Sequence, residues 1–178
     1  MQNNRKLLLY IAMSLDGYIA KQDGDISFLF EVEKDGEDYG YSTFMETVDT
    51  IIVGRKTYDK ILSMDIEWPY GSREVYVLSR SPKPDSETLH FYSGNLSDLI
   101  SNLKRQEGKH IYCDGGGETV NQLLLEDLID EMIISVIPVL LGDGIPLFKG
   151  GLNEKKLRLL SADSFEKGLV QLHYICVK

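Results

Sequence analysis

The sequence is poor in the residues that build metal centres and disulfide frameworks. Its 178 residues include only two cysteines and three histidines. Cys113 and Cys176 lie far apart and form no C-x-x-C motif, and the histidines are scattered. This pattern predicts two reduced thiols and no zinc site, and we expect no metal cofactor.

Long hydrophobic runs and basic clusters are also absent. No segment approaches the roughly 20 apolar residues that a membrane-spanning helix needs, and the first apolar run is too short for a signal peptide. Nineteen basic residues face 28 acidic ones, a net charge of −9. Such a charge repels phosphate-rich surfaces, so we expect a cytoplasmic protein without nucleic-acid or membrane partners. An anionic ligand would need a locally basic pocket.

What the sequence does contain favours one domain over residues 1–178. Its 43% hydrophobic residues suffice for a sizeable core, and no Pro- or Ser-rich linker divides it. Short apolar runs predict buried strands, and helical periodicity predicts helices between them. The expected strands are 6–13, 50–53, 74–78, 88–92, 110–113 and 131–141, and the expected helices lie around 38–48, 58–62, 96–103 and 120–128.

The last part of the chain has a different pattern. Residues 157–165 and 169–177 flank a Glu-Lys-Gly turn, and 170–176 alternate apolar and polar side chains, which predicts a hairpin. We therefore predict an α/β fold with three layers: a mainly parallel central sheet, helices on both faces and an antiparallel C-terminal hairpin. Ligands of such sheets bind beyond the carboxyl ends of the strands.

The strongest motif is HIYCDGGGETV (110–120), where a predicted strand leads through three glycines into a helix. Without Cβ atoms, the backbone of Gly115, Gly116 and Gly117 can approach a ligand closely. Unpaired N–H groups at the helix start favour an anion, and a pyrophosphate fits. A tight turn without a ligand explains three glycines equally well, and the G-x-G-x-x-G fingerprint is absent.

Two further strand ends carry cations. In TIIVGRKTY (50–58), Arg55 and Lys56 open a helix, where cations oppose the helix dipole unless an anion lies between them. In VYVLSRSPK (75–83), Ser79 and Arg80 offer a hydroxyl and a guanidinium, the groups that bind a 2′-phosphate. An NAD site would place an acidic residue there, so Arg80 favours NADP.

These segments, in this order, resemble the dihydrofolate reductase-like superfamily. The closer match is the branch of the reductase domain of riboflavin-biosynthesis deaminase/reductases, the RibD C-terminal domain, and its stand-alone relatives. The deaminase half has no counterpart, because neither H-x-E nor P-C-x-x-C occurs. The matching segments span nearly the whole chain and are SLDGYIA (14–20), VGRKTY (53–58), LSR (78–80), DGGG (114–117) and PVLLGDGIPLF (138–148).

The resemblance implies an NADPH-dependent reductase with a small heterocyclic or sugar-linked substrate, similar to 5-amino-6-(5-phosphoribosylamino)uracil reductase. It also implies a cis peptide bond between two of the three glycines. Dimers are common in this branch, and the C-terminal hairpin is the candidate interface of a homodimer. The implied cofactor-binding residues are Ala12 and Ile19 at the nicotinamide, Val53, Gly54, Arg55, Lys56 and Thr57 at the phosphates, Leu78, Ser79 and Arg80 at the 2′-phosphate, and Asp114, Gly115, Gly116, Gly117, Glu118 and Thr119 at the pyrophosphate.

Reduction of a carbon–nitrogen linkage also requires a proton. A carboxyl group whose pKa is raised in an apolar pocket would supply it. Asp16 is the first candidate because it follows the first strand at the mouth of the predicted cleft, although Asp-Gly is also a common turn. Asp38 is the second, about where dihydrofolate reductases place their substrate-binding acid, and a helix N-cap explains it equally well.

Two other functions stay open. One is a dihydrofolate or pterin reductase. The other is a nucleotide- or flavin-binding module without turnover. Flavodoxin-like sheets bind phosphate just after the first strand, usually with Ser/Thr-rich turns. Here Asp16 follows that strand and would repel a phosphate, so the flavin interpretation is the weaker one.

Overall fold

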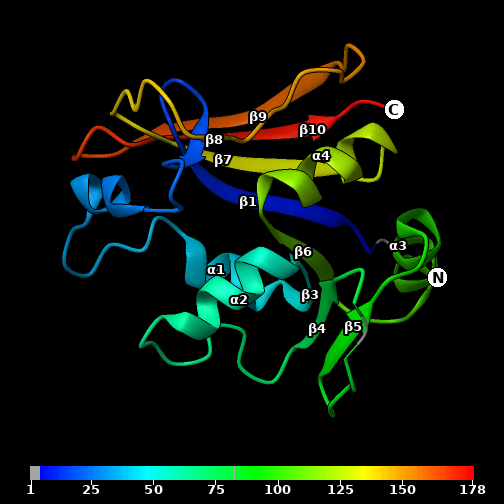
Figure 1. Cartoon of the computed structure of the whole chain (residues 1–178). Coiled ribbons are helices and arrows are strands. Elements are labelled where there is room, and N and C mark those ends of the chain that lie inside the picture. The colour runs from blue at the N-terminus through cyan, green and yellow to red at the C-terminus, as the bar shows by residue number, and fades with distance from the viewer. Residues whose placement is uncertain (1–4, 82) are drawn as a thin grey trace.

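The computed structural model describes residues 5–81 and 83–178, which contain an eight-stranded sheet in the order β5-β4-β3-β6-β1-β7-β10-β9. The first six strands in this order are parallel to one another, and β10 runs antiparallel to both of its neighbours, β7 and β9. Figure 1 shows β9 and β10 along one edge of the sheet and β4 and β5 at the other. This arrangement confirms the predicted mainly parallel α/β fold with a C-terminal hairpin.

The element boundaries follow the sequence pattern closely. The strands of the main sheet are β1 (Leu7–Ser14), β3 (Val48–Gly54), β4 (Glu74–Leu78), β5 (Leu89–Tyr92), β6 (His110–Gly115), β7 (Glu131–Ile137), β9 (Leu157–Ser164) and β10 (Val170–Cys176). The helices are α1 (Tyr41–Glu46), α2 (Arg55–Ser63), α3 (Leu96–Arg105), α4 (Gly117–Leu125) and the 3-10 helix η1 (Ser27–Val32). A separate two-stranded sheet pairs β2 (Tyr18–Ala20) with β8 (Ile145–Pro146).

Alternate residues of the central strands fill two hydrophobic layers. On one face, Leu7 and Leu9 of β1 pack with residues of α3 and α4. On the other face, Leu8 packs with residues of α1 and α2. Strands that are buried on both sides need continuous apolar sequence, which is why β1 and β3 were recognisable as short apolar runs. The helix α3 begins as predicted, because the side chain of Asn95 accepts the N–H of Asp98 at 3.0 Å.

Three sequence expectations need correction. The strand expected over 131–141 ends at Ile137, directly before Pro138, which lacks the N–H needed for the ladder. The helix expected over 38–48 is only Tyr41–Glu46, because Gly40 adopts a left-handed φ of 83° just before it. The helix expected over 120–128 ends at Leu125. The sequence analysis missed η1, β2 and β8, which are too short for a periodic pattern.

In the described ranges, no helix has both the length and the apolar character that a membrane crossing requires.

Candidate functional site

The carboxyl ends of the central strands meet at one rim of the sheet. Leu78 at the end of β4 lies opposite Gly54 at the end of β3. Val53 in turn lies opposite Gly115 at the end of β6, and β1 is the next strand. The register therefore brings together the three strand ends that the sequence singled out.

The three glycines allow α4 to approach its neighbours closely. The peptide bond between Gly115 and Gly116 is cis, as the family resemblance implied, and Gly115 has a φ of 105°. A Cβ atom at Gly54 would lie 2.6 Å from Thr119 Oγ1, and one at Gly117 would lie 2.7 Å from the carbonyl oxygen of Pro146. Only glycine fits at these two contacts, and together they fix the start of α4 against β3 and β8.

The start of α4 presents unpaired donors. In the part of the chain that the structure describes, the N–H groups of Gly117, Glu118 and Thr119 reach no acceptor, and the first N–H bond belongs to Val120, which donates to Gly116. The side chain of Ile19 lies beside this turn, since its Cδ1 is 3.6 Å from the Cβ position of Gly117. Unpaired donors at the positive end of a helix dipole suit a bound phosphate or carboxylate.

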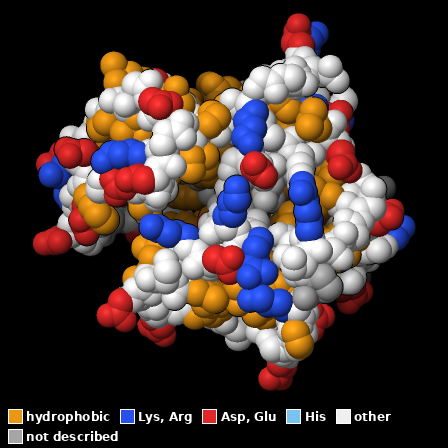
Figure 2. Space-filling model, viewed as in Figure 1, with side chains coloured by type: hydrophobic (Ala, Val, Ile, Leu, Met, Phe, Trp, Pro, Cys, Tyr) orange, Lys and Arg blue, Asp and Glu red, His pale blue; other side chains and the backbone are white. Residues whose placement is uncertain are grey.

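Basic side chains surround this helix start. The ammonium group of Lys149, 3.2 Å from Glu118, lowers the pKa of Glu118, and the charges of Lys56 and Arg80 lower it further. Neither Lys56 nor Arg80 forms an ion pair within the described ranges. Figure 2 shows Lys and Arg side chains gathered over α2 and the start of α4. A basic patch thus exists on an acidic protein. The sequence analysis missed Lys149 because this residue lies outside any strand-end motif.

Further cations lie at the ends of β4 and β5. Arg55 Cζ is 5.9 Å and Lys83 Nζ is 5.6 Å from the ring centroid of Phe91. The Nε of Arg55 donates to both carboxylate oxygens of Asp59, each at 2.8 Å. Lys83 was not singled out from the sequence, because its approach to this rim depends on the loop that follows Arg80.

Ser79 is engaged within its own loop. Its hydroxyl donates to the carbonyl oxygen of Ser81 at 2.9 Å and accepts the N–H of Ser81 at 3.2 Å. A contact of this hydroxyl with a 2′-phosphate would therefore require a rotated side chain. The predicted role of Ser79 stays a prediction.

The pKa of Asp16 is shifted in the opposite direction from the one expected. Its exposed carboxylate accepts the hydroxyl of Ser14 at 2.5 Å and the N–H groups of Leu141 at 3.1 Å and Gly142 at 2.7 Å. The Ser14 hydrogen bond, helped by these N–H groups, lowers the pKa of Asp16. The expected rise by burial is wrong. The carboxylate joins the end of β1 to the 139–142 loop, and its catalytic role stays a prediction.

Asp38 is likewise exposed and hydrogen-bonded to backbone. It accepts the N–H groups of Gly40 and Ser42, each at 2.9 Å, just before and at the start of α1. Hydrogen bonds from Ser42 and Gly40 lower the pKa of Asp38. The N-cap residue of α1 is Gly40 and not Asp38, although the Asp38 carboxylate accepts an N–H of the first turn from two residues before it. The catalytic role of Asp38 stays a prediction.

A third carboxylate, Asp114, occupies a different environment. It lies at the end of β6, one residue before the cis peptide bond, where Tyr70 Oη donates to its Oδ2 at 2.5 Å and Tyr112 Oη donates to its Oδ1. Burial and the nearby Asp114 charge raise the pKa of both tyrosines, so they remain neutral donors. Burial and the same charge raise the pKa of Tyr41 to about 12. The sequence analysis assigned Asp114 to the cofactor and missed these tyrosines.

Aromatic rings extend this environment. Tyr41 packs edge-on against Tyr10 and Tyr112, with ring centroids 5.5 Å and 6.4 Å apart, and Trp68 packs edge-on against Tyr70 at 5.0 Å. Figure 2 shows the surface hollowed between η1 and the helices α1 and α2, with hydrophobic side chains inside. A carboxylate among aromatic rings suits a planar ring that carries N–H groups.

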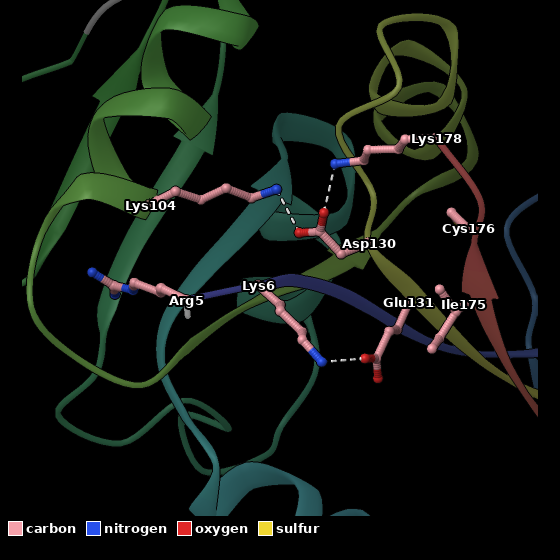
Figure 3. Close-up of a pocket in the computed structure, with 8 residues that line it drawn as sticks. All are labelled: Arg5, Lys6, Lys104, Asp130, Glu131, Ile175, Cys176 and Lys178. Atoms are coloured by element: carbon pink, nitrogen blue, oxygen red, sulfur yellow. Dashed lines mark hydrogen bonds and ion pairs between the residues drawn. The ribbon is translucent and has the colours of Figure 1, made fainter. Parts of the chain in front are cut away.

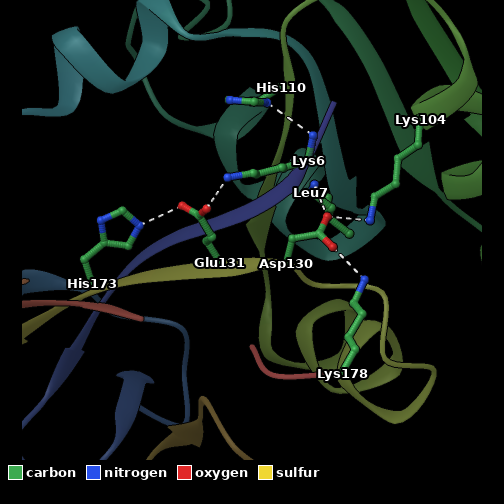
Figure 4. A network of polar contacts seen from close by, with 8 residues as sticks. All are labelled: Lys6, Leu7, Lys104, His110, Asp130, Glu131, His173 and Lys178. Carbon is green, nitrogen blue, oxygen red and sulfur yellow. Dashed lines mark hydrogen bonds and ion pairs between the residues drawn. The ribbon is translucent and has the colours of Figure 1, made fainter. Parts of the chain in front are cut away.

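The opposite rim of the sheet contains two cavities, of about 390 Å³ and 490 Å³, both lined by Arg5. Figure 3 shows the first, where Lys104 and Lys178 both point to Asp130 while Lys6 points to Glu131. Figure 4 shows how the network continues through His173 to Glu131 and from Asp130 to the N–H of Leu7. In the first cavity the lining charges largely pair with one another, and in the second Arg5 pairs with Asp49.

Across the described residues, no three His, Cys, Asp or Glu side chains come together in a way that could hold a metal ion.

The model of the RibD C-terminal domain matches residues 5–171. This chain belongs to the RibD C-terminal domain family. The YwjB protein of Bacillus subtilis (strain 168) is 47% identical over 172 residues, which cover 96% of this chain and 98% of YwjB. A crystal structure of a putative riboflavin biosynthesis protein from Shewanella sp. PV-4 has a TM-score of 0.89 at 35% identity, with 97% of this chain and 99% of that chain covered.

More distant structures share the fold of this RibD-like chain. The diaminohydroxyphosphoribosylaminopyrimidine deaminase/5-amino-6-(5-phosphoribosylamino)uracil reductase of Thermotoga maritima has a TM-score of 0.74 at 15% identity, over 97% of this chain and 57% of that chain. Dihydrofolate reductase from Enterococcus faecalis, complexed with NADP(H), has a TM-score of 0.66 at 16% identity, over 100% and 99%. The predicted RibD branch is therefore confirmed, and these neighbours show the dihydrofolate reductase-like fold.

Proposed function

We propose that this RibD-like protein is an NADPH-dependent reductase of a small heterocyclic substrate, of the pyrimidine-reductase type. The observation that carries the proposal is the rim where unpaired N–H groups of α4 lie among Lys56, Arg80 and Lys149. The Enterococcus enzyme with this fold is complexed with NADP(H), and the Thermotoga protein is a phosphoribosylaminouracil reductase by name. Both names are those of reductases and support the proposed reduction.

The residues at this rim fit the cofactor. The N–H groups of Gly117, Glu118 and Thr119, with Lys56, would hold the pyrophosphate. Arg80, together with Arg55 and Lys83 beside Phe91, would hold the 2′-phosphate. Ala12 and Ile19 would lie against the nicotinamide, because Ile19 adjoins the glycine turn. The bound cofactor supplies the hydride.

The protein's own part is to orient the substrate and to handle the proton. Asp114 keeps lone pairs that the hydroxyls of Tyr70 and Tyr112 do not occupy, and these can accept ring N–H groups. The surrounding aromatic rings would hold a planar heterocycle over the same place. Asp114 is therefore the carboxylate through which we expect a proton to reach the reduced nitrogen.

The cofactor assignment is tested by calorimetry with NADPH and NADH on the intact protein and two variants. Arg80→Ala should weaken NADPH by about 10- to 150-fold, because a charge-assisted contact contributes about 1.5–3 kcal/mol. It should leave NADH nearly unchanged. The control Arg105→Ala, at an exposed position of α3, should alter neither affinity. Equal losses for both coenzymes would refute the 2′-phosphate role, and absence of NADPH uptake by the unaltered protein would refute the proposed function.

A further inference from the structure

The half-buried carboxylate of Asp114 is held by two tyrosine hydroxyls that come from different parts of the chain. Tyr112 lies two residues before it in β6, and its hydroxyl donates to Asp114 Oδ1. Tyr70 comes from the loop after α2, 44 residues away, and its Oη lies 2.5 Å from Asp114 Oδ2. The strand supplies the first hydroxyl locally, and the fold brings in the second.

The two hydroxyls differ in how fully each is committed to this carboxylate. Tyr112 Oη also lies 3.2 Å from the carbonyl oxygen of Tyr10, and a hydroxyl has only one proton to donate. Among the residues that the structure describes, Tyr70 Oη donates to Asp114 alone. Burial and the nearby Asp114 charge raise the pKa of Tyr70, so its phenol keeps the proton. Tyr70 is therefore the more constant donor.

Packing and hydrogen bonds fix Tyr70 in place. It is 1% exposed, and its ring packs edge-on against Trp68 with the centroids 5.0 Å apart. Its carbonyl oxygen accepts the backbone N–H of Arg73 at 3.3 Å and Nη1 of the same residue at 3.2 Å. The Arg73 guanidinium also donates to the carbonyl oxygens of Met45 at 2.8 Å and Val48 at 3.1 Å. These bonds tie the loop that carries Tyr70 to the end of α1 and the start of β3.

A carboxyl group that transfers a proton must keep its oxygens in one orientation toward the reacting atom. Rotation of the Asp114 carboxylate would break the hydrogen bonds with both tyrosines. Each oxygen has two acceptor sites, so one site per oxygen stays open. We propose that Tyr70 is a positioning residue, whose hydroxyl fixes the Asp114 carboxylate in the orientation that serves proton transfer. This inference rests on the proposed function and on the role of Asp114 in it.

The test is steady-state oxidation of NADPH with 5-amino-6-(5-phosphoribosylamino)uracil and, in parallel, with dihydrofolate. Tyr70→Phe keeps the ring and removes only the hydroxyl. It should lower kcat by about 10- to 100-fold, because a small misplacement of a reacting group is costly, and leave the KM for NADPH unchanged. The control Tyr76→Phe, whose ring packs against His90 and belongs to the hydrophobic layer on the opposite face of the sheet, should alter neither. Melting temperatures check that both variants fold.

A double variant separates positioning from a merely structural role. Combined with Asp114→Asn, Tyr70→Phe should lower kcat no further, because the group that it positions is already lost. Additive losses overturn the proposal. Unchanged kcat in Tyr70→Phe beside a loss in Asp114→Asn also overturns it and leaves the reductase and Asp114 standing. Full turnover by Asp114→Asn removes the role on which the proposal rests. No turnover of either probe by the unaltered protein overturns the proposal together with the proposed function.

Discussion

The two rims of the central sheet use charge in opposite ways. At the amino-end rim, Lys104 and Lys178 pair with Asp130, while Lys6 and His173 pair with Glu131. At the carboxyl-end rim, Lys56 and Arg80 have no ion pair among the described residues, and the N–H groups that open α4 have no acceptor. Cations that neutralise half-buried carboxylates stabilise the fold, and cations left unpaired beside helix donors are available to a ligand.

The comparison also shows that the size of a cavity does not locate the chemistry. The cavities of about 390 Å³ and 490 Å³ lie at the amino-end rim, where the carboxylates of Asp130, Glu131 and Asp49 already form ion pairs. An anion that entered there would have to displace carboxylates that already hold hydrogen bonds. At the carboxyl-end rim, an anion can bind the unpaired N–H groups of α4 without displacing a carboxylate.

The largest expected effect concerns Asp114, a carboxylate of the carboxyl-end rim, compared with Asp16 at the end of β1. Asp114→Asn should lower turnover by about 10²- to 10⁴-fold, the range for loss of a proton-transferring group. NADPH affinity should change little, as calorimetry would show. Asp16→Asn is the comparison variant, since Asp16 binds backbone N–H groups. A larger loss of turnover with Asp16→Asn than with Asp114→Asn would return the catalytic role to Asp16.

The glycine contacts of the carboxyl-end rim can be broken directly. Gly117→Ala would put a Cβ atom 2.7 Å from the carbonyl oxygen of Pro146, so the start of α4 must move. We expect NADPH affinity to fall by about 10- to 150-fold, because the N–H contacts with an anion contribute about 1.5–3 kcal/mol. In the control Gly150→Ala the added Cβ meets nothing within 4 Å. Unchanged binding by Gly117→Ala would separate α4 from the cofactor site.

At the amino-end rim, a substitution should change the free energy of unfolding. Burial raises the pKa of Asp130, but hydrogen bonds from Lys104 and Lys178 outweigh it, and the net pKa is lowered. A lowered pKa in the folded state contributes stability above about pH 4 that is lost as the pH falls further. Asp130→Asn should therefore cost about 1.5–3 kcal/mol at neutral pH in urea unfolding, and much less near pH 2. A cost independent of pH would contradict this.

The smallest expected effect tests whether the ion pair with Lys104 alone is enough to neutralise Asp130. The side chain of Lys178 is 50% exposed, and its Nζ lies 2.6 Å from Asp130 Oδ1. Lys178→Met should lower the free energy of unfolding by at most about 1 kcal/mol, because exposed pairs contribute little and Lys104 remains. A loss equal to that of Asp130→Asn would show that Lys104 alone cannot neutralise the carboxylate.

Sequence reasoning succeeded where structure and function are encoded locally. The strand, glycine turn and helix around Gly115 are contiguous, and the strand ends before Arg55 and Arg80 carry their cations with them. Alternation of strands and helices then sufficed to place these ends at one rim, since parallel strands share their carboxyl edge.

Sequence reasoning failed where a side chain's hydrogen-bond partner lies far away along the chain. Tyr70, which holds Asp114, is 44 residues away and lies in a loop. The N–H groups of Leu141 and Gly142 that lower the pKa of Asp16 come from 125 and 126 residues away. No local pattern predicts these distant contacts, although the Ser14 hydroxyl, which contributes most to the lowered pKa of Asp16, is only two residues away.

A single carboxamide connects the C-terminal strand to the aromatic hollow. The Nε2 of Gln171, in β10, donates to Tyr10 Oη, to the carbonyl oxygen of Tyr39 and to Ser135 Oγ, each at 3.1 Å. A residue of β10 thus sets the position of a ring at the hollow's wall. If the hollow holds the substrate as proposed, its recognition depends on a strand that lies two places from β1 in the sheet, and not on the strand ends alone.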